Sequence, residues 1–195
     1  MKQKWVFAFE DGDGKNKMLL GGKGANLCEM TQIGLNVPPG FTITTDACLA
    51  YLEHDELPKG AWEEILKNMK DLEAKTGKTF GGAENPLLVS VRSGSSMSMP
   101  GMMDTILNLG LNKTTLQGLI KLTDNPRFGY DAYRRFIQLY GKIALGVEDK
   151  HFDDAMAAMK KKVGISQDVD LKAEHLAELA DQFARIIEAN TGKPF

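Results

Sequence analysis

Apolar residues recur along the chain with two different spacings, and the change of spacing predicts two parts. In the first part, short β-branched and aromatic runs are typical of strands. Four strands are expected there, at residues 6–9, 41–44, 87–91 and 105–109. Apolar residues at helical spacing lie between these runs. They predict helices from Ala25 to Gly34, from a cap at Thr45 or Asp46 to about Glu53, and around residues 62–72, with a Gly-rich loop at 76–86.

From Asn112 onward almost every apolar pattern has helical spacing. Four amphipathic segments are expected, around residues 116–122, 133–144, 152–159 and 171–187. Short links between them predict a compact helical bundle. The chain is therefore expected to be an α+β protein, with a subdomain of strands and helices over residues 1–111 and an all-helical subdomain over residues 112–195.

Composition narrows the class of protein. The chain has 195 residues, of which 43% are hydrophobic and 26% charged, as in soluble globular proteins. A net charge of -2 argues against a general nucleic-acid binder. Cys28 and Cys48 form no disulfide framework and are expected to be reduced, while the three histidines have no metal-ligand spacing. No segment resembles a signal peptide or reaches transmembrane length, so we expect a cytoplasmic protein without membrane partners.

The stretch S-V-R-S-G-S-S-M-S-M-P-G-M-M-D-T, residues 90–105, is the strongest candidate for chemistry. A strand delivers Arg92 into a loop of serine, glycine and methionine, and a guanidinium binds phosphate with a bidentate fork. Hydroxyls and flexible glycine backbone suit the same ligand, and methionines can close over it. Asp104 either contacts a metal or caps the next strand. The alternative is a surface turn whose methionines reach the core. The loop residues are Ser93, Gly94, Ser95, Ser96, Met97, Ser98, Met99, Gly101, Met102 and Met103.

A second candidate is Gly21-Gly22-Lys23-Gly24, directly before the helix expected from Ala25. Helix N-termini bind anions through free N–H groups, and Lys23 adds a positive charge. The segment is neither a Walker A motif nor a Rossmann fingerprint. A flexible turn with a solvated lysine remains the alternative.

Four long motifs in order resemble one family. They are G-G-K-G-A-N-L-C-E-M, P-P-G-F-T-I-T-T-D-A-C, the loop continued as D-T-I-L-N-L-G, and R-F-G-Y-D-A-Y-R-R-F-I-Q-L-Y-G. Over essentially the whole chain they resemble the N-terminal nucleotide-binding domain of the pyruvate, phosphate dikinase family. The loop pattern M-S-M-P-G-M-M-D distinguishes this family from the phosphoenolpyruvate synthases.

The resemblance implies an ATP-grasp-like subdomain with a mixed sheet and the helical subdomain beside it. In the family, ATP gives its β-phosphoryl group to a histidine on another domain, inorganic phosphate takes the γ-phosphoryl group, and pyruvate becomes phosphoenolpyruvate. By motif position, Lys23 and Arg92 correspond to contacts with the ATP phosphates, and Arg92 is the expected catalytic residue. The full set expected to bind the nucleotide is Gly22, Lys23, Gly24, Arg92, Ser93, Gly94, Ser95, Ser96, Gly101, Asp104 and Thr105.

The chain is much shorter than members of this family. The magnesium ligands, the phosphohistidine domain and the pyruvate-binding barrel are expected outside it. We therefore expect an ATP-binding piece of a phosphotransferase that is inactive by itself, while the parent enzyme binds ATP with Mg²⁺ and phosphate and forms homo-oligomers. The alternative is a stand-alone, non-catalytic nucleotide- or phosphate-binding or regulatory module, and a third possibility is a structural helical cap without binding.

Overall fold

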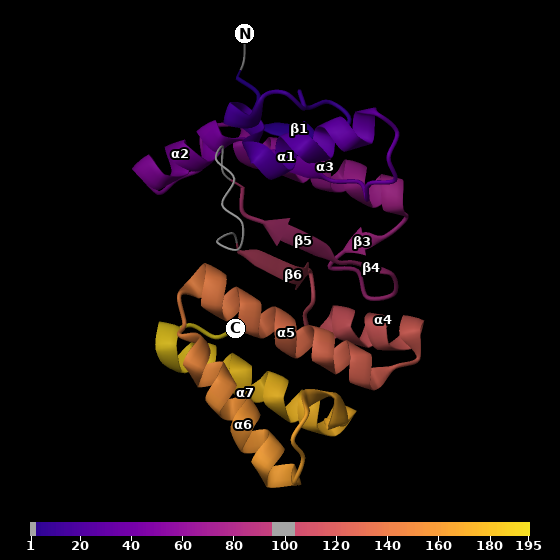
Figure 1. Cartoon of the computed structure of the whole chain (residues 1–195), viewed down its shortest axis with the longest axis vertical. Helices are drawn as coiled ribbons and strands as arrows, with labels where there is room; N and C mark the ends of the chain where they lie inside the picture. The colour runs from indigo at the N-terminus through magenta and orange to yellow at the C-terminus, as the bar shows by residue number, and fades with distance from the viewer. Residues whose placement is uncertain (1–2, 95–103) are drawn as a thin grey trace. The chain divides into compact units, whose positions relative to one another are not determined.

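The computed structural model of the protein describes residues 3–94 and 104–195 (Figure 1). These residues form two compact units. The first comprises the described residues of Met1–Gly77 and Ser93–Met103, and the second comprises Lys78–Arg92 and Asp104–Phe195. The units are interleaved along the chain, whereas the domain boundary expected at residues 111 and 112 stays a prediction.

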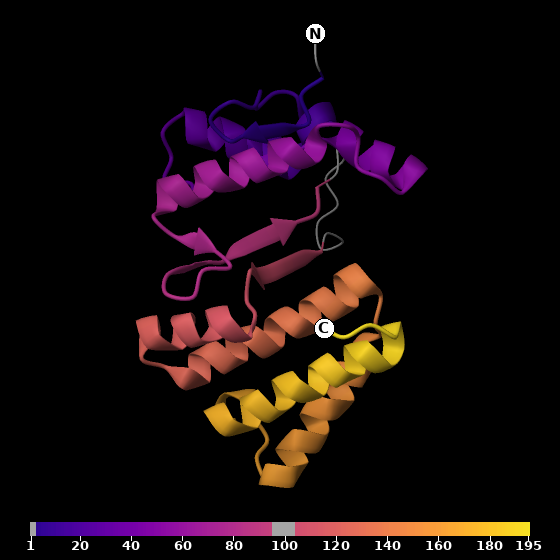
Figure 2. The same ribbon diagram turned by 180° about the vertical axis from the view of Figure 1, so that it is seen from behind.

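The first unit is built on a short antiparallel strand pair. Strand β1 (Val6–Ala8) pairs with β2 (Phe41–Ile43), with Val6 opposite Ile43 and Ala8 opposite Phe41. Helices α1 (Lys17–Gln32) and α3 (Ala61–Thr76) flank this pair (Figures 1 and 2), and α2 (Thr45–His54) follows β2. The expected cap of α2 at Thr45 or Asp46 is wrong, because the Thr44 side chain accepts the Ala47 N–H at 3.2 Å.

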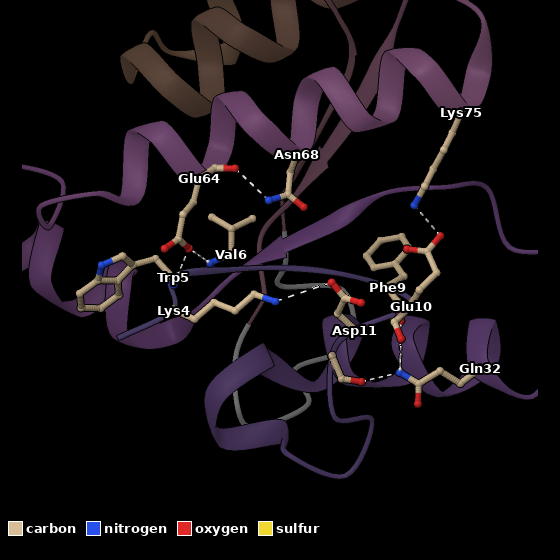
Figure 3. Close-up of polar contacts among 11 residues, drawn as sticks. Lys4, Trp5, Val6, Phe9, Glu10, Asp11, Gln32, Glu64, Asn68 and Lys75 are labelled. Carbon is tan, nitrogen blue, oxygen red and sulfur yellow. Dashed lines mark hydrogen bonds and ion pairs between the residues drawn. The ribbon is translucent and has the colours of Figure 1, made fainter. Parts of the chain in front are cut away.

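Polar contacts tie β1 to the helices on either side (Figure 3). The Glu64 carboxylate on α3 accepts the N–H groups of Trp5 and Val6, at 2.8 and 3.0 Å. The Gln32 side chain at the end of α1 donates to three carbonyls of the segment after β1, of which Gly12 is the nearest at 2.6 Å. These bonds fix the segment that leads into α1, where one candidate site begins.

The core of the first unit is small. One cluster joins four buried residues, Phe9, Leu20, Ala25 and Cys28, with Phe7, Leu19, Leu27 and Val37 packed around them. Val6, Ala47, Ala61 and Leu72 are buried outside this cluster. Two of the buried residues, Leu20 and Ala25, lie on either side of the Gly21–Gly24 motif. The core therefore anchors both flanks of that motif.

The second unit contains two more strand pairs. Strand β3 (Thr79–Phe80) pairs in parallel with β4 (Pro86–Leu87), and β5 (Val89–Arg92) pairs antiparallel with β6 (Thr105–Leu109). The expected loop at 76–86 is therefore partly wrong, since α3 extends to Thr76 and both β3 and Pro86 are paired. The expected strand at 87–91 is divided, because Leu87 pairs with β3 while Val89 begins the pairing with β6. The α+β class is confirmed, and the strands within residues 3–94 and 104–195 lie in three separate two-stranded sheets.

The four helices expected after residue 112 are all present. They are α4 (Lys113–Thr123), α5 (Pro126–Leu145), α6 (Asp149–Val163) and α7 (Ala173–Thr191), with a short 3₁₀ turn at Asp168–Asp170 before α7. Asn112 and Asn125 cap α4 and α5 through their side chains. Glycines in the left-handed conformation end the last three helices, at Gly146, Gly164 and Gly192.

The helices enclose the larger core of the molecule. Phe152 and Phe183 pack edge to face at its centre, with ring centroids 5.0 Å apart. Helix α5 also packs against β6, so the bundle carries the hairpin whose loop contains the candidate residues. Within the described ranges, no helix is long and apolar enough to cross a membrane.

Candidate functional site

Helix α1 contains a break in the middle of the Gly21–Gly24 motif. The expected helix start at Ala25 is wrong, because α1 begins at Lys17, where the Asn16 side chain accepts the Leu19 N–H at 3.1 Å. Gly21 then leaves helical geometry, with φ 68° and ψ 161°. These dihedrals fall in a region that is essentially open to glycine alone. Gly22, Lys23 and Gly24 thus open a second helical segment, whose first N–H groups lack the partners of a continuous helix.

Packing against strand β2 fixes the beginning of this second segment. Gly24 is buried, and a Cβ atom placed on it would lie 2.7 Å from Thr42 Cγ2 and 2.8 Å from Thr42 Oγ1. Glycine is therefore required for the close approach of the helix to the strand. Ala25 and Cys28 continue the buried face, and burial raises the pKa of the Cys28 thiol. The same packing leaves Lys23 exposed.

The Lys23 side chain extends to the start of the Ser/Met loop. Its Nζ donates a hydrogen bond to the Ser93 carbonyl at 3.3 Å, across 70 residues of sequence. An ammonium carries three donors, so this bond leaves it capacity for an anionic ligand. The structure thus places an exposed cation beside both the new helical start and the first residue of the loop.

Both ends of the loop join the β5–β6 hairpin. Arg92 is the last residue of β5 and pairs with Thr105, the first residue of β6. Arg92, Ser93, Gly94 and Asp104 are exposed, and Thr105 is half-buried. Three predicted residues, Ser95, Ser96 and Gly101, lie outside the described residues, as do Ser98 and the four loop methionines. The structure therefore brings Arg92 and Thr105 together at the loop end of one hairpin.

The second unit adds charges to the surroundings of Asp104 that sequence reasoning missed. Lys142 on α5 donates to Asp149 at 2.6 Å, and this bond is the main cause that raises the Lys142 pKa. Asp104 raises the same pKa to a smaller extent through its negative charge. No local signal in the sequence links residues 104 and 142, because the packing of α5 on β6 brings them together.

Lys23 belongs to the first unit and Arg92 to the second. Their combination in one phosphate site, and the roles of the other predicted residues, stay predictions.

In residues 3–94 and 104–195, no group of three His, Cys, Asp or Glu side chains could hold a metal ion. His54 and His151 lie on the surface, whereas His175 is half-buried and accepts the Lys172 N–H at 3.2 Å. Both cysteines are free.

Known proteins share this sequence at high identity. Residues 17–76 match the family model described as pyruvate phosphate dikinase, AMP/ATP-binding domain. A pyruvate, phosphate dikinase of Entamoeba histolytica is 57% identical over 191 residues, which cover 97% of this chain and 22% of that protein. Those of Clostridium symbiosum and Giardia intestinalis are 49% and 50% identical, over 98% and 92% of this chain and 22% and 20% of theirs.

The chain thus spans about a fifth of the length of the curated relatives that it matches. The matched family segment contains the whole of α1, with its break at Gly21 and Lys23 beyond it. A stand-alone module of another kind, the alternative left open by the sequence motifs, is not favoured by these matches. The resemblance is confirmed: nearly the whole chain is similar to part of the pyruvate, phosphate dikinases, and residues 17–76 match their AMP/ATP-binding domain.

Proposed function

We propose that this chain binds the phosphates of ATP for a pyruvate, phosphate dikinase. The observation that supports this most strongly lies within the segment matching the AMP/ATP-binding domain. There the Gly21 break opens a helical start, and Lys23 next to it is exposed and extends to the Ser93 carbonyl. A helical start and a lysine together suit a polyphosphate, because both favour negative charge.

In this proposal the residues have separate roles. The backbone N–H groups of Gly22 and Gly24 approach the phosphate oxygens, and Lys23 neutralises part of their charge. Arg92 binds a second face of the polyphosphate through its planar guanidinium, helped by the loop residues and by Asp104 and Thr105. Phosphoryl transfer depends mainly on alignment and charge neutralisation, so these residues can contribute to the rate without covalent chemistry.

The complete reaction requires more chain than these residues. We propose that the parent protein converts ATP, phosphate and pyruvate into AMP, pyrophosphate and phosphoenolpyruvate through a phosphohistidine on another domain. Mg²⁺ would accompany ATP and lower the charge of the transferring group, held by carboxylates outside this chain. A cytoplasmic homo-oligomer is the accompanying proposal for the parent protein.

The test uses the whole enzyme that carries this sequence, with Lys23→Ala and Arg92→Ala. Each is expected to slow the ATP and phosphate half-reaction by about 10²-fold or more, as loss of a charge-stabilising donor does elsewhere. Exchange between pyruvate and phosphoenolpyruvate should be spared, because it does not use the ATP site. Lys70→Ala, which removes another exposed lysine of the matched segment, is the control and should change neither rate. Equal loss of both half-reactions in the Lys23 and Arg92 variants would contradict the proposal.

A further inference from the structure

The break in α1 changes the hydrogen bonds of two carbonyls. In a continuous α-helix, the carbonyls of Met18 and Leu19 would accept the N–H groups of Gly22 and Lys23, four residues later. Gly21 lies between these partners and has dihedrals far from helical values. The break therefore separates two carbonyls on one side from two N–H groups on the other.

A hydroxyl from another helix satisfies the carbonyl side of this break. Thr45, the first residue of α2, places its Oγ1 2.5 Å from the Met18 carbonyl oxygen and 3.2 Å from that of Leu19. One hydroxyl proton can be shared between two acceptors. Thr45 thus supplies, from 26 to 27 residues away in sequence, the donor that the helix itself no longer provides.

The N–H side of the break is fixed from the neighbouring strand. Thr42 on β2 lies against Gly24 so closely that no side chain fits there. Thr42 lies in β2 and Thr45 begins α2. Between the two elements lies Thr44, the buried cap of α2. The β2–α2 connection therefore contacts α1 on both sides of Gly21.

From this geometry we propose that Thr45 is a positioning residue for Lys23. By bonding the Met18 and Leu19 carbonyls, it stabilises the broken form of α1 over a continuous helix. In the broken form the N–H groups of Gly22 and Lys23 are available to an anionic ligand, which on the proposed function is the ATP polyphosphate. Thr45 does not touch that ligand. It acts through the backbone that carries Lys23.

Nuclear magnetic resonance of the ¹⁵N-labelled chain tests the positioning directly. Thr45→Val removes the hydroxyl and keeps the shape of the side chain. It is expected to shift the amide signals of Gly21–Gly24 and to slow hydrogen exchange at Gly22 and Lys23, as their N–H groups return to helical bonds. Thr45→Ser keeps the hydroxyl and should leave these signals close to those of the unchanged chain. Thr45→Ala gives the same test should Thr45→Val not fold.

A matched control lies in the same helix. The Thr31 Oγ1 donates to the Leu27 carbonyl at 2.8 Å, far from the break. Thr31→Val therefore removes a comparable bond of α1 and should leave the Gly21–Gly24 amides unchanged. The proposal is overturned if Thr45→Val leaves those amides in place, or if Thr45→Ser moves them as much as Thr45→Val does.

Titration with Mg-ATP of the whole enzyme that carries this sequence, with the same substitutions, separates this proposal from the proposed function. Thr45→Val should weaken binding about fivefold, the effect of roughly one net hydrogen bond. In a Lys23→Ala background it should weaken binding by less, because the two residues act through one element. Equal affinities of the unchanged chain and Lys23→Ala would refute the proposed role of Lys23, while the amide shifts would still decide the role of Thr45. Equal weakening by Thr45→Val with and without Lys23 would overturn the positioning proposal.

Discussion

The two compact units differ in how their structure is held together. Among the described residues, the second unit joins sixteen buried residues in one cluster, whereas the cluster of the first joins four and leaves other buried residues, such as Val6 and Leu72, outside it. The first unit leaves large apolar side chains exposed, including Leu52 at 74% and Ile33 at 69%. Its candidate residues depend instead on single contacts, such as Thr45 to Met18 and Gly24 to Thr42. We therefore expect apolar burial to contribute more to the stability of the second unit, and single contacts to matter more in the first.

The largest expected effect concerns the core of the second unit. Phe183 is fully buried and packs on Phe152, so Phe183→Ala should lower the free energy of unfolding of that unit by about 3–5 kcal/mol. Urea unfolding followed by residue-specific amide signals measures this. Val169→Ala, at a position 67% exposed, is the control with little expected effect. The comparison breaks down if amides of β1 and α1 lose their signals at the same lowered urea concentration as those of α5 and α7.

An intermediate effect is expected at the break in α1. Gly21→Ala must either adopt dihedrals that cost about 1–3 kcal/mol for a residue with a Cβ atom or close the break into a continuous helix. Both outcomes should destabilise the first unit and move the amide signals around Lys23. Asn26→Ala, an exposed position of the same helix, should change stability by less than about 0.5 kcal/mol. Unaltered stability and signals in Gly21→Ala would mean that the break is not needed.

The smallest expected effect is on the stability of each unit in acid. One ion pair from each unit tests it. Hydrogen bonds from Lys75 to Glu10, at 2.8 Å, and from Lys142 to Asp149 lower the pKa of each carboxyl below its ordinary value, 4.5 and 3.8 respectively. The ionised carboxylate stabilises the fold, so each contribution is complete above the ordinary pKa and disappears as the pH falls through the lower, folded-state pKa. All four side chains are more than a third exposed, and salt should weaken both effects.

Variants of the two lysines locate these effects. Lys75→Met should return the pKa of Glu10 toward 4.5 and affect acid unfolding of the first unit alone, and Lys142→Met should do the same for Asp149 and the second unit. The carboxyl carbon shifts of each residue, followed against pH, report its titration directly. Identical titration of Glu10 with and without Lys75 would show that the pair does not form in solution.

Sequence patterns were most reliable where local chemistry decides the structure. The four helices after residue 112 have apolar residues at helical spacing, and glycines close three of them, so their existence followed from local preferences. Strand β6 was expected at the residues where it lies, Thr105–Leu109. One error has a local cause that the pattern of apolar residues did not reveal. The helix start expected at Ala25 is wrong, because the Asn16 side chain caps α1 seven residues before Lys23. Gly21 then interrupts the helix.

The sequence by itself determined the α+β class, the helical second half and the candidate ligands, because spacing, caps and motif residues are local properties. The Gly21–Gly24 and Ser90–Thr105 motifs also carried the resemblance to the pyruvate, phosphate dikinases. Only the tertiary structure decided that the glycine motif sits at a break inside a helix. Thr45 and Thr42 contact α1 on the two sides of that break, because β2 and α2 fold against it. Hydrogen bonds between residues so far apart in sequence leave no periodic signal, so they appear only once the chain is folded.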